Sequence, residues 1–262
     1  MKGIEGKTYI VTGAASGIGK ATAVQLAAEG ANLIITDLNE PMLLGVAREL
    51  QSEKHDVSTV VGDVTSNELL DRLIDTAQTR FGCLDGAVTC AGRILIRPMQ
   101  QVTHLDWDAI MDLNLKSVFF LVRACAEAMK KCNRHGSIVT LSSTSAHGPR
   151  PNNIDYAVSK LGVDQITRTI ALEYAPSRIR VNAVSPGVIN TPMWQSVDRL
   201  RGAHLGLSPG ELTEQIVNAI PIRRLGMPED VASLITFLLS DSADYITGQV
   251  IEIDGGYMLS NP

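Results

Sequence analysis

The sequence is poor in aromatic residues and contains no long hydrophobic run. Aromatic side chains make up 4% of its 262 residues. The longest apolar stretches, SVFFLV and LITFLL, are far too short to span a bilayer. The first residues, MKGIEGKTYIV, interrupt their apolar positions with charges, which is not the pattern of a signal peptide. We therefore expect a cytoplasmic protein with no membrane partner.

Basic residues are also too few to suggest a nucleic-acid partner. The net charge is −5, the calculated pI is about 5.5, and no long basic run occurs. The cysteines form no CxxC pair, and their spacing fits no zinc template. They are Cys83, Cys90, Cys125 and Cys132. The sequence predicts reduced thiols and no metal site.

Short apolar segments alternate with helical patterns along the whole chain. The early segments are apolar throughout, as expected of strands that are covered on both faces. The expected strands are residues 8–12, 32–37, 57–63, 84–92, 136–143, 179–187 and 248–256. Repeated strand–helix units form parallel sheets with right-handed crossovers. The sequence predicts an α/β fold of the Rossmann-like, doubly wound type, with a seven-stranded parallel sheet and helices on both faces.

No linker, low-complexity tract or internal repeat divides the chain, so we expect a single domain over residues 1–262. Its cofactor-binding part would cover about 1–140 and its catalytic part about 141–262. Residues 188–227 break the strand–helix alternation. Long insertions of this kind are often mobile lids, and we expect a substrate lid here.

The first expected strand runs into the glycine-rich segment TGAASGIGK, which contains Gly13, Gly17 and Gly19. Glycines at a strand-to-helix turn allow the backbone to approach a pyrophosphate at the helix N-terminus. The spacing is GxxxGxG rather than GxGxxG. A dinucleotide site is favoured by this position, and a purely structural turn is the alternative.

Acidic residues end the next two expected strands. Asp37 is placed to accept hydrogen bonds from the adenosine ribose, and it would repel a 2′-phosphate. No Arg or Lys follows in DLNEP to offset that repulsion, so the sequence favours NAD over NADP. Asp63 is placed to meet the adenine amino group. A helix cap is the alternative role for both side chains.

Tyr156 and Lys160 lie four residues apart in DYAVSK, at the start of an expected helix. Side chains at this spacing rise from the same helix face. A nearby ammonium lowers the pKa of a phenol and makes it a usable proton donor and acceptor. Working near neutral pH would require a shift of about three units from ~10, or roughly 4 kcal/mol, supplied by Lys160 and the positive nicotinamide ring.

These motifs together resemble the classical short-chain dehydrogenase/reductase family over the whole chain. The matching pieces are TGAASGIG, DLN at 112–114, SS at 142–143, YAVSK, RVNAVSPG and GQVIEIDGG. The resemblance implies that Tyr156 is the acid/base and that Lys160 binds the nicotinamide ribose. It implies that Ser143, thirteen residues before Tyr156, polarises the substrate, and that Asn114 distorts its helix and holds a water in a proton relay.

The resemblance also implies the lining of the cofactor and substrate sites. The cofactor residues would be Gly13, Ser16, Gly17, Ile18, Gly19, Asp37, Leu38, Asp63, Val64, Cys90, Ala91, Gly92, Tyr156, Lys160, Pro186, Gly187, Ile189 and Thr191. The substrate residues would be Ser143, Ser145, His147, Asn153, Tyr156, Met193 and Trp194. Arg97, Arg150 and His204 lie in the same stretches, where an arginine is either an anion ligand or a solvated surface residue.

One position departs from the family pattern. The family usually has Asn-Asn-Ala-Gly after the fourth strand, whereas this chain has Thr89-Cys90-Ala91-Gly92. Cys90 is a weaker hydrogen-bond partner than Asn, and losing one contact costs on the order of 1 kcal/mol. We expect altered stability or affinity rather than lost chemistry. A buried, inert thiol is favoured over a redox-sensitive one.

The resemblance implies an NAD(H)-dependent oxidoreductase that interconverts a secondary alcohol and a ketone by direct hydride transfer, without a metal. A 3-oxoacyl thioester reductase is the nearest alternative, and a non-catalytic NAD-binding regulator is another. The resemblance also implies a homotetramer. Its interfaces would be formed by the helix at 104–131 with the helix after Tyr156, and by the C-terminal IEIDGGYMLSNP.

Overall fold

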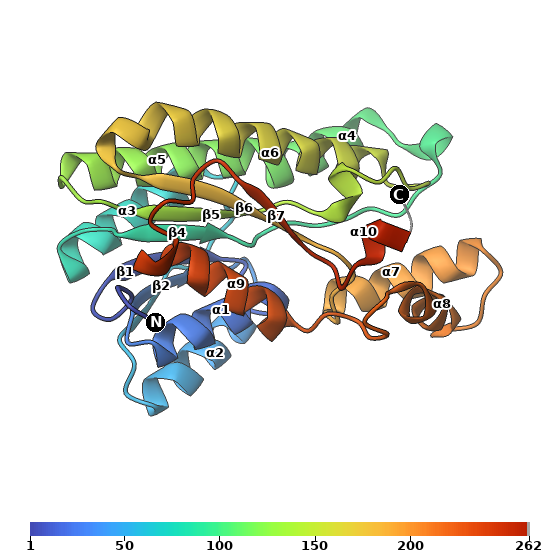
Figure 1. Ribbon diagram of the computed structural model, residues 1–262, viewed down its shortest axis with the longest axis horizontal. Coiled ribbons are helices and arrows are strands. Elements are labelled where there is room, and N and C mark those ends of the chain that lie inside the picture. Colours follow the sequence, from blue (N-terminus) through green and yellow to red (C-terminus); the bar gives the residue numbers. More distant parts are fainter. Residues whose placement is uncertain (261–262) are drawn as a thin grey trace.

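The computed structural model describes residues 1–260 and contains a seven-stranded sheet between two layers of helices (Figure 1). The strands are β1 (Thr8–Thr12), β2 (Asn32–Thr36), β3 (Val57–Thr59), β4 (Gly86–Thr89), β5 (Ser137–Leu141), β6 (Arg180–Pro186) and β7 (Val250–Ile253). Their order is β3-β2-β1-β4-β5-β6-β7, and every neighbouring pair is parallel. The doubly wound, Rossmann-like prediction is confirmed. From β1 the chain first adds strands on one side, β2 and β3, and then on the other side, starting with β4. Ligands of such sheets bind in the crevice at this switch point.

Both faces of the sheet are buried because the strand side chains alternate between two apolar cores. Tyr9 and Val11 pack with α1 (Gly17–Ala28), α2 (Glu40–Ser52) and α9 (Pro228–Leu239). Ile10 and Ile34 pack on the other face, with α3 (Asn67–Phe81), α5 (Ser117–Lys131) and α6 (Ile154–Tyr174). This double burial explains why the strands read as continuous apolar runs. Within residues 1–260, no helix combines the length and apolarity needed to cross a membrane.

Six of the seven strands are shorter than the sequence patterns indicated, and only β1 matches its predicted range. β2 and β6 differ by one or two residues, and β5 covers 137–141 rather than 136–143. β3 ends at Thr59 rather than 63, β4 covers 86–89 rather than 84–92, and β7 covers 250–253 rather than 248–256. The remaining residues of those patterns form the loops at the sheet edge. The residues that follow β3 and β4, such as Asp63 and Cys90, leave the hydrogen-bonded ladder and line the crevice.

The segment predicted as one long helix contains a break. α4 (His104–Met111) and α5 are joined by a π-helical turn, Asp112–Lys116. Such turns occur frequently at functional sites. The expected lid is largely helical, with α7 (Pro192–His204) and α8 (Glu211–Ala219), and the last helix is α10 (Tyr257–Ser260).

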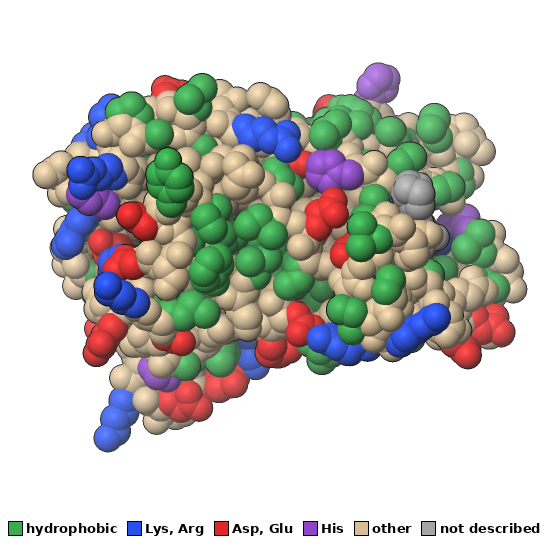
Figure 2. Space-filling model, viewed as in Figure 1, with side chains coloured by type: hydrophobic (Ala, Val, Ile, Leu, Met, Phe, Trp, Pro, Cys, Tyr) green, Lys and Arg blue, Asp and Glu red, His purple; other side chains and the backbone are tan. Residues whose placement is uncertain are grey.

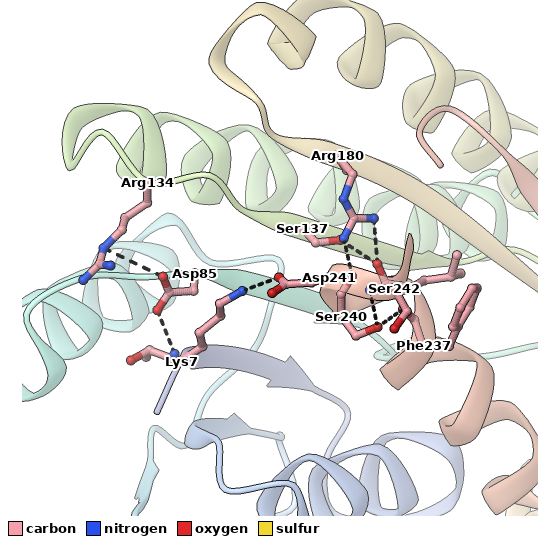
Figure 3. A network of polar contacts seen from close by, with 11 residues as sticks. Lys7, Asp85, Arg134, Ser137, Arg180, Phe237, Ser240, Asp241 and Ser242 are labelled. Carbon is pink, nitrogen blue, oxygen red and sulfur yellow. Dashed lines mark hydrogen bonds and ion pairs between the residues drawn. The ribbon is translucent and has the colours of Figure 1, made fainter. Parts of the chain in front are cut away.

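A polar network fastens the amino ends of the strands (Figure 3). Arg180 at the start of β6 donates hydrogen bonds to the carbonyls of Leu238 (2.8 Å) and Ser240 (3.0 Å), which end α9. Asp85 accepts a hydrogen bond from the Thr8 amide at 2.9 Å. The arginine satisfies carbonyls that a helix C-terminus leaves unpaired. These contacts tie α9 and β1 to the sheet, while the residues predicted to be functional gather at the opposite, carboxyl edge.

Candidate active site

Two adjoining clefts lie at the carboxyl edge of the sheet. The first is lined by the predicted cofactor residues Gly13, Ser16, Gly17, Ile18, Gly19, Asp37, Leu38, Asp63, Val64, Cys90, Ala91, Gly92 and Thr191. The second is lined by the predicted residues Ser143, Ser145, Asn153, Tyr156, Lys160, Pro186, Gly187, Ile189, Met193 and Trp194. Ile18, Cys90, Gly92, Thr191 and Met193 border both clefts. The fold therefore brings segments from the whole chain to one site.

The glycine-rich loop is packed too tightly for side chains. A Cβ on Gly19 would overlap the carbonyl oxygen of Gly13. A Cβ on Gly13, whose φ is +64°, would lie 2.8 Å from the backbone nitrogen of Ala91. These contacts hold the loop against the end of β4 and expose the N-terminus of α1 in the first cleft. The loop therefore has both a structural role and the form of an anion-binding turn.

Asp37 connects the glycine-rich loop to the end of β2. Its carboxylate accepts hydrogen bonds from the amides of Ala15 (3.1 Å) and Asn39 (2.9 Å). Asn39, rather than Asp37, is the N-cap of α2, so the helix-cap alternative is wrong for Asp37. A carboxylate has about four acceptor positions, which leaves room for ribose hydroxyls.

Asp63 also borders the first cleft, where its carboxylate accepts a hydrogen bond from the Thr65 amide at 2.9 Å. Ser66 occupies the N-cap position of α3, so Asp63 does not cap that helix. Thr191, predicted as a cofactor residue, borders both clefts. It caps α7 by accepting from the Trp194 amide at 3.3 Å, and its methyl group contacts the position of Gly17.

Ser143 and Tyr156 come together in the second cleft from different elements. Ser143 follows β5 and is buried, and its Oγ accepts a hydrogen bond from the Ser145 amide at 3.1 Å. The Ser143 side chain also acts on the Tyr156 hydroxyl, whose pKa it lowers. The neighbouring Ser142 hydroxyl instead donates to the Lys160 carbonyl at 3.4 Å. These contacts support the choice of Ser143 over Ser142.

Lys160 is buried one helical turn after Tyr156. Its ammonium donates a hydrogen bond to the Leu141 carbonyl at 2.7 Å and lies 5.7 Å from the centroid of the Tyr156 ring. Burial lowers the pKa of Lys160 to about 8, while Cys90 and Asp164 oppose that shift. A side chain near its titration point suits proton exchange near neutral pH.

The protein by itself raises the pKa of Tyr156, whereas the predicted lowering also requires the positive nicotinamide ring. Burial raises this pKa, and the Ser143 side chain opposes the rise only in part. Desolvation disfavours the phenolate more than the protein's own groups favour it. The protein alone thus holds Tyr156 in its neutral, proton-donating form.

Asn114 lies in the π-helical turn and is fully buried. Its side chain accepts from the Arg93 amide at 3.0 Å and donates to the Arg93 carbonyl at 2.8 Å. A Cβ on Gly92 would lie 3.2 Å from the Asn114 oxygen and 3.8 Å from the Lys160 nitrogen. Asn114 therefore holds the loop after β4 close to Lys160.

Cys90 lies where the two clefts meet, and burial of the thiol raises its pKa to about 12. A thiol with this pKa stays protonated and is a poor nucleophile, as the inert interpretation predicted. All four cysteines are free.

The substrate lining differs from the prediction at His147. Its Nε2 lies 3.0 Å from the Asp164 carboxylate on α6, and it does not border the second cleft. Arg97 pairs with Asp106, and the Nδ1 atom of His204 lies 2.7 Å from the Leu200 carbonyl. The lining residues that the prediction did not include are Ile94, Leu141, Ser142, Thr144, Val188, Val197, Arg201, Leu212, Ile216 and Tyr257. The lid and C-terminal segments carry no local pattern that indicates which side chains turn inward.

Burial of Lys160 costs stability, and replacing it with methionine should show this. Because its pKa is lowered in the folded state, the charged amine destabilises the fold below about pH 8. The penalty disappears as the pH rises toward the unfolded value of 10.5. The shift corresponds to roughly 3 kcal/mol, from which the lost hydrogen bond subtracts about 1 kcal/mol. In urea unfolding we expect Lys160→Met to be about 2 kcal/mol more stable than wild type at pH 7.

That difference should narrow steadily between pH 8 and 10.5. Lys116→Met is the matched control, because Lys116 is exposed and pairs only with Asp112 four residues away. A Lys160→Met protein that is less stable than wild type at pH 7, or a gap independent of pH, would contradict the buried-charge interpretation.

Comparisons with known proteins identify the family. Residues 13–258 match the family model described as Enoyl-(Acyl carrier protein) reductase. The chain is 38% identical over 256 residues to the 3-oxoacyl-[acyl-carrier-protein] reductase FabG of Thermotoga maritima, covering 98% of this chain and 99% of that protein.

Two solved structures agree. One is a short-chain type dehydrogenase/reductase from Mycobacterium ulcerans, with a TM-score of 0.89, 34% identity, and coverage of 97% of this chain and 90% of that one. The other is a variant actinorhodin polyketide ketoreductase with NADPH, with a TM-score of 0.92, 29% identity, and coverage of 98% and 99%. The chain belongs to the short-chain dehydrogenase/reductase family of oxidoreductases.

Proposed function

We propose that this protein interconverts a secondary alcohol and a ketone by direct hydride transfer with NAD(H), and that Tyr156 is the acid/base. The convergence of Ser143, Tyr156 and Lys160 where the cofactor cleft meets an apolar pocket carries the proposal. Screening ketones and secondary alcohols for a change in reduced-nicotinamide absorbance tests it. Absence of turnover across that panel, in a protein that binds NADH, would favour a non-catalytic regulator.

Each residue has a defined task in this reaction. During reduction Tyr156 donates its proton to the carbonyl oxygen, and during oxidation it accepts one. Ser143 donates a hydrogen bond to the same oxygen as charge develops there. Lys160 holds the nicotinamide ribose and stabilises the phenolate that remains. Bound NAD supplies the hydride chemistry and a positive ring that also favours the phenolate.

We propose NAD rather than NADP because of the charges near the adenosine end. Asp37 and Asp63 face that part of the cleft, and Leu38 is 72% exposed beside them. Among the described residues that line the cleft, the only basic side chain is Arg93, next to Gly92. A 2′-phosphate there would meet carboxylates without a compensating cation. The structure of the polyketide ketoreductase contains NADPH, which is a finding about that protein. The proposal of NAD for this chain is based on the charges of its own cleft.

Replacing Asp37 with alanine should relax this discrimination. The change removes the acceptor for the ribose hydroxyls and the charge that repels a phosphate. We expect about tenfold weaker NADH binding and several-fold tighter NADPH binding, measured by fluorescence titration. Asp71→Ala, an exposed change on α3, should alter neither affinity. Equal binding of both cofactors to the wild type would remove the argument for NAD.

A 3-oxoacyl thioester is the second candidate substrate class. The similarity to the Thermotoga maritima reductase favours it, and the Ser–Tyr–Lys set serves that reaction equally well. The complete catalytic set argues against a regulator without turnover. Comparing a 3-oxoacyl thioester with the corresponding simple ketone, at equal concentration, distinguishes the two enzyme candidates.

We also propose a homotetramer. Leu161 (51% exposed) and Leu172 (79% exposed) lie on α6, and Leu105 (81% exposed) lies on α4. β7 is an edge strand with half-buried apolar residues, and hydrophobic side chains gather on the face that carries it (Figure 2). Exposed apolar surface and an open strand edge are features that association covers.

Sedimentation velocity at micromolar concentration should give a mass four times that of the 28.2 kDa chain. Leu161→Glu should lower it, because the carboxylate would be buried without a partner at the helix interface. Leu259→Glu, at an exposed position near the C-terminus, is a second probe for the other interface. A monomeric wild type would contradict the tetramer.

A further inference from the structure

The second cleft contains a group of polar side chains besides the catalytic ones. Arg150 lies in the loop before α6, Arg201 on α7 and Tyr257 on α10. Arg150 donates a hydrogen bond to the Tyr257 hydroxyl at 2.9 Å, and its guanidinium lies 4.7 Å from the centroid of the Tyr257 ring. Arg201 donates to the Pro151 carbonyl at 3.3 Å. Three distant parts of the chain thus bring two cations and a hydroxyl together.

Neither arginine has an acidic partner in the part of the chain that the structure describes. The ion pairs found there involve other basic groups. Burial and the nearby charge of Arg150 lower the pKa of Arg201, so the two guanidinium groups repel each other. Partly buried cations that lack counter-ions are costly, and an anion between them would remove both penalties.

A buried side-chain amide in the same cleft also indicates a polar ligand. Asn153 is 2% exposed, and both polar atoms of its side chain are buried without a hydrogen-bond partner. It occupies the N-cap position of α6 but makes no side-chain cap bond. It lies midway in sequence between Arg150 and Tyr156, and it lines the cleft with them. Buried amides of this kind are normally satisfied, so a ligand oxygen is a suitable partner.

The remaining walls are apolar. Ile94, Val197, Leu212 and Ile216 line the cleft. A ligand that fits this lining has a hydrocarbon body, an oxygen that reaches Ser143 and Tyr156, and an anionic group for the arginines.

We propose that the cleft binds substrates carrying an anionic oxygen group, a carboxylate or a phosphate, in addition to the reacting alcohol or ketone. Arg150 and Arg201 bind the anion, and Asn153 and the Tyr257 hydroxyl are further donors. Guanidinium groups suit this task because their planar donors match carboxylate and phosphate oxygens. The assignment rests on the proposed function, because it adds the substrate class to the same reaction.

Binding of three six-carbon probes to the NADH-saturated protein tests the proposal. Hexanoate and hexyl phosphate carry the two possible anions, and hexanol is the neutral control. In calorimetric titrations we expect at least one anion to bind ten times more tightly than hexanol. The anion that binds more tightly shows whether the substrate's anionic group is a carboxylate or a phosphate. Arg201→Met should weaken anion binding at least tenfold and leave hexanol within twofold, and the Arg150→Met/Arg201→Met double variant should abolish the preference.

Arg199→Met is the matched control, because Arg199 lies on the same helix α7 but is exposed and outside the cleft. Thermal unfolding with NADH shows whether each variant folds. If the double variant does not fold, Arg201→Met alone still tests the proposal, because it removes only the hydrogen bond to the Pro151 carbonyl. Equal affinity for hexanol and both anions, no measurable anion binding, or an anion affinity that is unchanged in Arg201→Met would overturn the proposal. A protein that binds the anions as expected but turns over no ketone or alcohol would instead refute the proposed reaction.

Discussion

Replacing Tyr156 with phenylalanine is expected to lower kcat by about 10²- to 10⁴-fold, the range that a positioned general acid contributes. Phenylalanine retains the ring that lines the cleft and removes only the phenolic hydroxyl. Affinity for NADH should therefore stay within about twofold of wild type, because the remaining cofactor contacts are unchanged. Steady-state kinetics and fluorescence titration measure the two quantities separately. Tyr245→Phe, at a fully exposed position, is the matched control.

The acid/base role of Tyr156 also predicts how the rates of reduction and oxidation change with pH. Burial raises the pKa of Tyr156, so the neutral phenol persists at and above neutral pH. Ketone reduction needs that neutral form, whereas alcohol oxidation needs the phenolate. Oxidation should therefore speed up as pH rises and reduction should slow down. Substantial activity in Tyr156→Phe, or pH profiles with the opposite slopes, would remove Tyr156 from the acid/base role.

Replacing Gly19 with alanine should abolish cofactor binding. The added Cβ would overlap the Gly13 carbonyl oxygen, a backbone atom that moves only if the whole loop moves. Such a shift would displace the α1 N-terminus from the first cleft. We expect NADH affinity to fall at least about 100-fold, and overpacking to cost about 1–3 kcal/mol of unfolding free energy.

Gly45→Ala provides the control for this glycine. Gly45 lies in α2, and a Cβ there would meet no atom within 4 Å. Alanine favours a helix by roughly 0.5–1 kcal/mol over glycine, so this variant should be more stable and bind NADH normally. Normal NADH binding by Gly19→Ala would show that the loop tolerates a side chain, and the proposed dinucleotide contact would then be wrong.

The strand–helix alternation and the order of motifs could be predicted from the sequence, because each depends on residues that are close together in the chain. Apolar runs such as TYIVT predicted strands, and the burial of both sheet faces explains why the pattern was continuous rather than alternating. Strand ends were less accurate, because an apolar or glycine residue can continue a strand or leave it for the cleft. In β4 the structure ends the strand at Thr89, just before Cys90.

Spacing along α6 placed Tyr156 and Lys160 on one helix, and this geometry needs only the α-helical repeat. The pKa of Tyr156 could not be predicted from this spacing alone. The direction in which the Tyr156 pKa shifts depends on how far tertiary packing removes the phenol from water. Sequence proximity to an ammonium predicted a lower pKa, whereas desolvation raises it.

The sequence by itself determined the fold class, the glycine turn, the acidic residues at the strand ends and the shared helix of Tyr156 and Lys160, because short-range periodicity and spacing carry that information. The roles of Ser143, Tyr156 and Lys160 as a set came from the resemblance to the family. Only the tertiary structure decided that His147 turns to Asp164 and that Arg150, Arg201 and Tyr257 share one cleft. Those residues are far apart in the chain, and long-range packing alone selects which of their side chains meet.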